Sequence, residues 1–300
     1  MIGPNFFIVG APKCGTTALY HYLKQHPEIY LPGEKELHFF GSDLDLRVNR
    51  PNRSQYLSLF ADAKDEKRVG EASVWYLYSK NAAAEIKEFN PSAAIIIMLR
   101  NPVDMLYSLH SQFLYNGNEN ISDFRSALDA ENDRKRGLRI PGSVIHVAGL
   151  FYRETVKYAE QVERYFRIFG KENVHVIIYD DFARDTAAAY RNTCDFLGVA
   201  NDFTPHMRVI NPNKKVRSTV LRRFLTRPPS WSRKVGSLLI PRRHVRDSLK
   251  KTLSQFNTQY TSRAPMEAEL RRILAREFIP EMEKLSMLLD KDLSRWCRNG

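Results

Sequence analysis

The stretch Gly10–Thr17, GAPKCGTT, decides the expected fold, because it has the spacing of a phosphate-binding loop with its lysine in an unusual place. A Walker A loop has two glycines separated by four residues, followed by Lys and Ser/Thr. Gly10 and Gly15 keep that spacing, but Thr16 occupies the lysine position, and the lysine is Lys13, inside the loop. The stretch therefore predicts a phosphate site with a displaced lysine.

The residues on either side of this loop support an anion site. The apolar run Phe6–Gly10 predicts a buried strand, and Gly15–Gln25 predicts a helix whose apolar residues share one face. The first-turn N–H groups of such a helix have no partner inside it, and the helix dipole adds about half a positive charge there. The predicted phosphate ligands are Lys13, Cys14, Gly15, Thr16 and Thr17.

Further along the chain, uninterrupted apolar strands alternate with helices. This pattern predicts an α/β fold with a central parallel sheet flanked by helices on both faces. The further predicted strands are residues 93–99 and 174–179, and the further predicted helices are residues 80–89, a helix from Pro102, and residues 151–166, 185–197 and 265–289. We expect one domain over residues 1–300, with a basic loop or lid inserted at about 208–251 and a C-terminal helix at about 265–289.

Composition narrows the class of protein. The 300 residues are 43% hydrophobic and 27% charged, which is typical of a soluble globular protein. The longest apolar stretch, Ala93–Leu99, is far shorter than the roughly 20 residues that span a bilayer. With no recognisable signal peptide, we expect a cytoplasmic protein; the alternative is a lumenal domain of an anchored enzyme expressed without its anchor. The three cysteines have neither metal-ligand nor disulfide spacing, so we expect no metal.

The positive charge of the chain is concentrated in one segment. Residues 208–251 contain 14 lysines and arginines against a single acid, Asp247, which accounts for the whole net charge of +12. Such a segment attracts anions. The chain lacks a base-stacking motif or helix-turn-helix signature, so we do not expect nucleic acid as the partner.

A second anion site is predicted at the end of the strand over residues 93–99. In nucleoside triphosphatases a later strand ends in an Asp that holds Mg²⁺. Here the strand ends in Arg100, and Ser108 lies about two turns into the helix that follows. An arginine at the carboxyl end of a strand beside the phosphate loop places a bidentate cation on an anion. The sequence thus predicts two phosphate sites and no magnesium carboxylate.

These motifs resemble those of the sulfotransferases that use 3′-phosphoadenosine 5′-phosphosulfate (PAPS), most of all the glycan-modifying (heparan sulfate type) and bacterial members. GAPKCGTT resembles their 5′-phosphosulfate loop and RNPVDMLYSLHSQF (Arg100–Phe113) their 3′-phosphate motif. GEKELHFF (Gly33–Phe40) resembles the segment with the catalytic glutamate, and residues 263–296 resemble the C-terminal helix. The matches run from residue 6 to residue 296, but residues 208–251 have no clear match.

The resemblance implies a function and a role for each site residue. The chain is expected to be an enzyme that moves a sulfuryl group from PAPS to an acceptor hydroxyl, leaving 3′-phosphoadenosine 5′-phosphate (PAP), without a metal. Lys13 stabilises the leaving oxygen, where charge develops. Arg100 and Ser108 bind the 3′-phosphate, and Arg263 is a further candidate for that contact.

Two residues are candidates for the base that takes the acceptor proton. The resemblance favours Glu36; His38 is the alternative, because its unperturbed pKa is nearer neutrality. In an extended stretch Glu34, Glu36 and His38 would point to the same side. A glutamate base profits from a pKa raised by burial or by a neighbouring carboxylate.

Two other function classes remain open from the residues alone. One is a P-loop kinase or nucleoside triphosphatase, and the other is a non-catalytic anion-binding module that uses the basic segment. For the sulfotransferase, we favour a carbohydrate acceptor, which can be anionic or bound to a carrier; a small metabolite is the other option. The oligomeric state cannot be derived from the sequence.

Overall fold

The computed structural model describes residues 3–207, 214–217, 252, 256–261 and 263–298. The chain divides into two compact units, one made of residues 1–210 and 266–300 and the other of residues 211–265. The first unit contains the phosphate loop and most of the predicted site residues. In the second, β6 (Lys214–Val216) pairs antiparallel with β7 (Thr258–Tyr260). Most of the predicted basic insertion at 208–251 lies outside the described residues.

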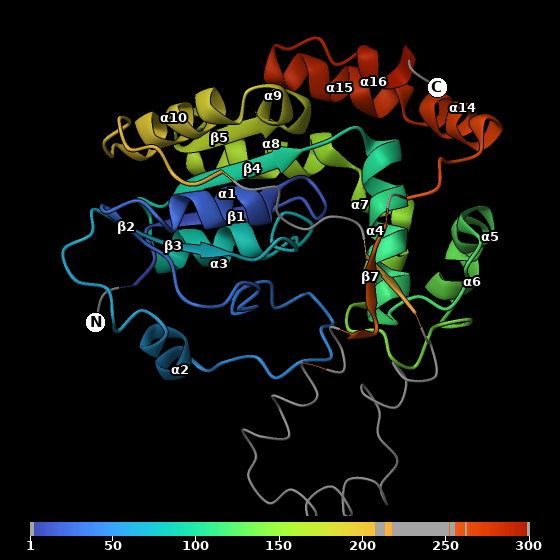
Figure 1. Ribbon diagram of the computed structural model, residues 1–300, viewed down its shortest axis with the longest axis horizontal. Coiled ribbons are helices and arrows are strands. Elements are labelled where there is room, and N and C mark those ends of the chain that lie inside the picture. The colour runs from blue at the N-terminus through green and yellow to red at the C-terminus, as the bar shows by residue number, and fades with distance from the viewer. Residues whose placement is uncertain (1–2, 208–213, 218–251, 253–255, 262, 299–300) are drawn as a thin grey trace, which may run out of the picture. The chain divides into compact units, whose positions relative to one another are not determined.

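The described part of the first unit is built around a five-stranded parallel sheet (Figure 1). The strands lie in the order β2, β3, β1, β4, β5. In the central register, Phe6 of β1 pairs with Gly70 of β3 on one side and with Ala94 of β4 on the other. The strand bounds are β1 Phe6–Gly10, β2 Ile29–Tyr30, β3 Arg68–Ala72, β4 Ala94–Leu99 and β5 Val174–Ile178.

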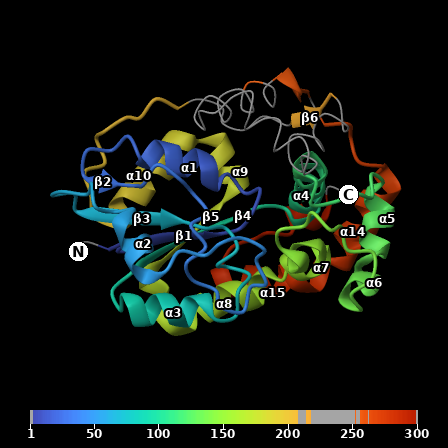
Figure 2. The ribbon, with the colours of Figure 1, turned by 90° about the horizontal axis from the view of Figure 1, so that it is seen from below.

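Helices cover both faces of this sheet. Figure 2 shows α1 and α10 on one face and α3 and α8 on the other. Every residue of β1 and β4 is buried, as expected of parallel strands covered on both sides. The helix bounds are α1 Thr16–Leu23, α2 Arg53–Ser58, α3 Ala82–Phe89, α4 Pro102–Asn116, α5 Phe124–Asp129, α6 Glu131–Lys135, α7 Tyr152–Thr155, α8 Tyr158–Phe169, α9 Tyr179–Arg184, α10 Thr186–Leu197, α14 Ala268–Glu277, α15 Ile279–Leu289 and α16 Arg295–Arg298, with 3₁₀ turns at Val147–Leu150 and Lys171–Asn173.

The predicted fold class is confirmed, and the differences concern element boundaries. The predicted strands at 6–10, 93–99 and 174–179 correspond to β1, β4 and β5. The helix predicted over 151–166 is two helices, because Lys157 has a non-helical backbone between α7 and α8. The helix predicted over 265–289 is also two, α14 and α15; Pro280 near the start of α15 has no N–H to bond back to α14.

A buried ion pair fixes the chain that follows α4. Arg134 Nη2 and Glu119 Oε1 are 2.7 Å apart, and both side chains are fully buried. The carboxylate also accepts hydrogen bonds from the backbone N–H groups of Asn120 and Ile121 and from the Tyr152 hydroxyl. A buried charge left without its partner costs far more than an exposed one. This pair therefore holds the loop after α4 against α6 and α7.

We expect Arg134→Met to lower the free energy of unfolding by about 3–5 kcal/mol, because Glu119 would keep a buried, uncompensated charge. Lys135→Met is the matched control, since Lys135 is the next residue along α6 and forms a partly exposed pair with Glu154. That substitution is expected to cost about 1 kcal/mol or less. Urea unfolding of the two variants would contradict this assignment if both lost the same stability.

Candidate active site

The site lies where the strand order changes direction. β1 lies between β3 and β4, and the chain continues to β2 and β3 on one side of it and to β4 and β5 on the other. Ligands of open α/β sheets bind at such a switch point, beyond the carboxyl ends of the strands. The phosphate loop follows the carboxyl end of β1, and Arg100 follows the carboxyl end of β4. The topology thus brings the two predicted anion-binding segments to one edge.

The loop has a backbone that few side chains allow. Gly15 is the N-cap of α1 with φ 91°, and Lys13 has φ 62°, so both lie in the left-handed region. At Gly10 the reason for glycine is close approach: a Cβ there would lie 2.5 Å from Leu77 Cβ and 2.9 Å from the Val74 carbonyl oxygen. The loop is therefore pressed against the segment that follows β3.

Lys13 reaches from the loop to α4. Its Nζ donates a hydrogen bond to Gln112 Oε1 at 3.1 Å. Ser108, which is buried, lies four residues earlier on the same face of α4. Lys13 thus contacts the face of α4 that carries Ser108, by way of Gln112, a residue that the sequence analysis did not single out.

Arg100 lies beside the loop and over an aromatic ring. Its guanidinium carbon is 4.6 Å from the centre of the Tyr179 ring, and its Nη1 is 3.5 Å from the Lys13 carbonyl oxygen. Tyr179 also packs against Gly15, where an added Cβ would lie 3.1 Å from the ring. One aromatic side chain therefore supports both the loop and the cation, an arrangement typical of arginine.

The remaining loop residues differ in what they can offer an anion. Cys14 is fully buried, its Sγ is 3.4 Å from the Pro12 carbonyl oxygen, and burial raises the pKa of the thiol to about 12. A neutral buried thiol is no anion ligand, so Cys14 can contribute only through its backbone. Thr16 is buried, whereas Thr17 is half-buried and its hydroxyl accepts a hydrogen bond from Lys35 Nζ at 3.1 Å.

Glu36 is held against the segment that follows β3. Its N–H donates to the Ala72 carbonyl at 2.8 Å, and its Oε2 accepts from the Val74 N–H at 3.0 Å. Burial raises the pKa of Glu36, and the ammonium of Lys35, 3.8 Å from Oε1, opposes this. Residues 34–38 do not form an extended stretch in which Glu34, Glu36 and His38 would share one side, since Glu36 has φ 62° and His38 has φ 54°. The hydrogen bond that Glu36 donates to the Ala72 carbonyl and the one that its carboxylate accepts from the Val74 N–H account for the bent path.

His38 lies in a different environment from Glu36. Burial, with Arg50 nearby, lowers the pKa of its imidazole to about 4. Its Nδ1 is buried and has no hydrogen-bond partner among the described residues. The His38 N–H donates to Ser73 Oγ at 3.3 Å. The two predicted base candidates thus have different charged neighbours. Glu36 lies beside Lys35, and His38 lies near Arg50.

A second carboxyl group, that of Glu71 in β3, is linked to this segment through the side chain of Ser73. Glu71 is buried and accepts hydrogen bonds from the hydroxyls of Tyr56, Tyr76 (2.7 Å) and Ser73 (2.8 Å). Ser73 in turn receives the His38 N–H. Burial raises the pKa of Glu71 to about 7, against the three hydroxyls and with a contribution from the charge of Glu36.

Sequence reasoning missed Glu71, Gln112 and Tyr179. From the sequence, Lys35 could be either exposed to solvent or in contact with the leaving group. A signal for Glu71 was that Glu71 and Ser73 are polar residues on either side of Ala72, an alternation that places both on one side of an extended segment. Gln112 and Tyr179 had no comparable signal, because their contacts cross between elements. Arg263 belongs to the second unit, and its role stays a prediction.

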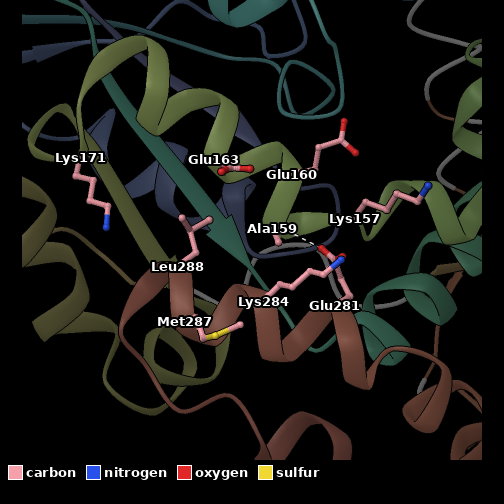
Figure 3. A pocket seen from close by; sticks show the side chains of 9 residues that line it. All are labelled: Lys157, Ala159, Glu160, Glu163, Lys171, Glu281, Lys284, Met287 and Leu288. Atoms are coloured by element: carbon pink, nitrogen blue, oxygen red, sulfur yellow. Dashed lines mark hydrogen bonds between the residues drawn. The ribbon is translucent and has the colours of Figure 1, made fainter.

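A separate hollow of about 750 Å³ lies between α8 and α15 (Figure 3). Its lining includes three lysines and three glutamates, with Met287 and Leu288 from α15. Glu281 accepts a hydrogen bond from the Ala159 N–H across it, at 2.7 Å. None of the predicted site residues lines this hollow, and its balanced charges do not favour an anion.

The described residues contain no group of three or more His, Cys, Asp or Glu side chains arranged to hold a metal ion. None of their helices has both the length and the apolar character needed to cross a bilayer.

Comparison with known proteins identifies the family. The sulfotransferase domain model matches residues 3–220, and the chain therefore belongs to the sulfotransferase family. A solved sulfotransferase from Alicyclobacillus acidocaldarius is 32% identical, with a TM-score of 0.74, over 99% of this chain and 100% of that one. The predicted family and fold are confirmed, and the kinase and non-catalytic alternatives are not favoured.

Curated relatives are more distant. Mouse carbohydrate sulfotransferase 15 is 26% identical over 74% of this chain and 51% of its own length. Human heparan sulfate glucosamine 3-O-sulfotransferase 6 is 24% identical over 87% of this chain and 70% of its own length. The match to human carbohydrate sulfotransferase 15 covers 29% of that protein, so the chain spans about half or less of the two carbohydrate sulfotransferase 15 relatives.

The raised pKa of Glu71 makes a prediction about stability. A carboxyl whose folded pKa is about 7 and whose ordinary value is 4.5 stabilises the fold below pH 4.5, and that contribution is lost as the pH rises through 7. Relative to Glu71→Gln, the wild-type protein should therefore lose about 2.5 kcal/mol of stability between pH 5 and pH 8. Urea unfolding at several pH values measures this difference.

Glu88→Gln, at an exposed glutamate of α3, is the control for a general effect of removing one carboxylate. If the stability of Glu71→Gln followed the wild type in parallel across this pH range, Glu71 would not be the group that titrates.

Proposed function

We propose that this chain transfers a sulfuryl group from PAPS to the hydroxyl of an acceptor. The observation that carries the proposal is that Thr17 of the phosphate loop and the carboxylate of Glu36 meet the same ammonium, that of Lys35. A donor-binding loop and a base must lie this close for a sulfuryl group to pass from the bound donor to an acceptor hydroxyl that the base deprotonates. Membership of the sulfotransferase family supports the same reaction.

The residues present fit the phosphates of such a donor. The N-terminus of α1, with Gly15 as its cap, offers backbone N–H groups to a 5′-phosphate. Lys13 is a flexible cation on the same loop, and its ammonium donates a hydrogen bond to a neutral amide, that of Gln112. Arg100, which lies over the Tyr179 ring, would bind a 3′-phosphate together with Ser108. When bound, PAPS supplies a sulfuryl group joined to its 5′-phosphate through a bridging oxygen.

Each side chain then has one task. Glu36 takes the proton of the acceptor hydroxyl; its raised pKa makes it a stronger base than an ordinary glutamate. Lys13 moves from Gln112 to the bridging oxygen and stabilises the charge left there. Arg100 and Ser108 hold the far end of the donor. Because the pKa of His38 is lowered to about 4, His38 is a weak base at neutral pH, and we assign it no proton transfer.

We propose a carbohydrate hydroxyl as the acceptor. The support is the curated relatives, which are named for carbohydrate and for heparan sulfate glucosamine sulfation. The basic segment at 208–251 would suit an anionic glycan or an acidic carrier. A cytoplasmic location stays a prediction from the sequence.

Donor binding can be measured before any acceptor is known. Calorimetric titration without magnesium is expected to show tight binding of PAP, and titration of ATP with magnesium is expected to show none. Arg100→Ala should weaken PAP binding about 100-fold, because a charged hydrogen-bonding partner of the 3′-phosphate is lost. Arg184→Ala is the control, at an exposed arginine of α9. Binding of ATP in preference to PAP would contradict the proposal.

Turnover separates the leaving-group and base roles. Glu36→Gln and Lys13→Ala should each lower the rate of sulfuryl transfer by about 100-fold or more. Glu36→Gln should leave PAP affinity nearly unchanged, since glutamine has the same shape and Glu36 contacts no phosphate. An active Glu36→Gln enzyme would remove Glu36 from the role of base. The measurement is transfer of labelled sulfate to a panel of glycans, with PAP formation followed in parallel.

A further inference from the structure

Lys35 is the residue of the site that no motif assigns. Its Nζ lies 3.1 Å from Thr17 Oγ1, in the first turn of α1, and 3.8 Å from Glu36 Oε1. Both distances end on one nitrogen, so the two oxygens can be no further apart than the two distances added together. The ammonium therefore lies at the junction between the phosphate loop and the base.

The ammonium of Lys35 is largely shielded from solvent. The side chain is 13% exposed. Burial lowers the pKa of its ammonium, and the carboxylate of Glu36 opposes that effect. Its Nζ is 5.7 Å from the centre of the Tyr20 ring. Tyr20 is itself anchored, because its hydroxyl donates to the Pro32 carbonyl. A cation held in a partly desolvated place interacts more strongly with a developing negative charge than one in water.

A neighbouring lysine shows what a structural role looks like here. Lys24 Nζ is 6.0 Å from the centre of the same Tyr20 ring and donates to the Pro32 carbonyl at 2.7 Å. It thus ties α1 to the loop that precedes Glu36. Lys35 is not needed for that tie, and its Nζ is directed instead to Thr17 and Glu36.

We propose that Lys35 is a catalytic residue that contacts the non-bridging oxygens of the sulfuryl group during transfer. The acceptor oxygen forms a bond to sulfur while the bond from sulfur to the bridging oxygen breaks. The electron pair of the broken bond stays on the bridging oxygen, beside Lys13, and the acceptor proton goes to Glu36. Lys35 keeps its proton throughout. Its positive charge offsets the negative charge of the sulfuryl oxygens while the sulfur lies between the acceptor oxygen and the bridging oxygen.

This role rests on the proposed function and predicts a difference between two ligands. PAP has the 5′-phosphate but no sulfuryl group, whereas PAPS has both. Removing the charge of Lys35 should therefore weaken PAPS binding and leave PAP binding nearly unchanged. A lysine that only shaped the loop would weaken both ligands alike.

The test uses Lys35→Met, which keeps an unbranched apolar stem over Tyr20, and Lys35→Arg, which keeps the charge. Lys24→Met is the matched control on the same ring. Calorimetry measures the affinities for PAP and PAPS without an acceptor, and PAP formation from saturating PAPS measures turnover, with water as the acceptor where no other is known. Thermal unfolding checks that each variant is folded.

For Lys35→Met we expect PAP affinity within about twofold of wild type, PAPS affinity lower by about fivefold or more, and turnover lower by about 100-fold. Lys35→Arg should recover at least about a tenth of the wild-type rate, and Lys24→Met should match wild type in all three. Wild-type turnover by Lys35→Met, or an equal loss of PAP and PAPS affinity, would overturn the role. A wild-type protein that bound neither ligand would instead overturn the proposed function itself.

Discussion

The segment Ser73–Leu77, directly after β3, is the common support of the site. Its N–H groups bond to β1, from Ser73 to the Ile8 carbonyl at 3.2 Å and from Leu77 to the Val9 carbonyl at 2.7 Å. The Val74 N–H donates a hydrogen bond to the Glu36 carboxylate. Gly10, the last residue of β1, packs so closely on the segment that any Cβ would collide with it. The positions of the phosphate loop and of the carboxylate are therefore both set by one short stretch of backbone.

Three cations lie around this support, and each has a different kind of partner. Lys13 is bonded to a neutral amide on α4, Arg100 lies over the ring of Tyr179, and Lys35 lies near the Glu36 carboxylate. Amide and ring contacts are weak compared with a bond to a phosphate or sulfate oxygen, so an anionic ligand can displace or extend them at little cost. This arrangement suits a ligand with several anionic groups along its length, each next to a different cation.

The two carboxyl groups of the site are tuned by opposite means. Glu36 is raised in pKa by burial and restrained by the neighbouring ammonium of Lys35. Among the described residues Glu71 forms no ion pair, and it instead accepts three hydroxyl hydrogen bonds in a buried place. When both carboxyl groups are ionised, their negative charges repel each other. Each charge therefore favours the protonated form of the other group. Glu71 is thus linked through Ser73 to the backbone of His38, two residues after Glu36, the base that we propose.

The sequence by itself determined the central strands, the phosphate loop with its displaced lysine and the arginine after β4, because burial and loop chemistry are local to a few consecutive residues. It placed the two phosphate segments together, since parallel strands end at one edge. The bent path of Glu36 and His38 came from contacts that no local pattern contains. The helix break at Phe278, by contrast, has a local cause in Pro280. The tertiary structure alone decided that Lys35 joins Thr17 to Glu36 and that Glu71 supports them, because these contacts link segments 18 or more residues apart or depend on which side chains share a buried space.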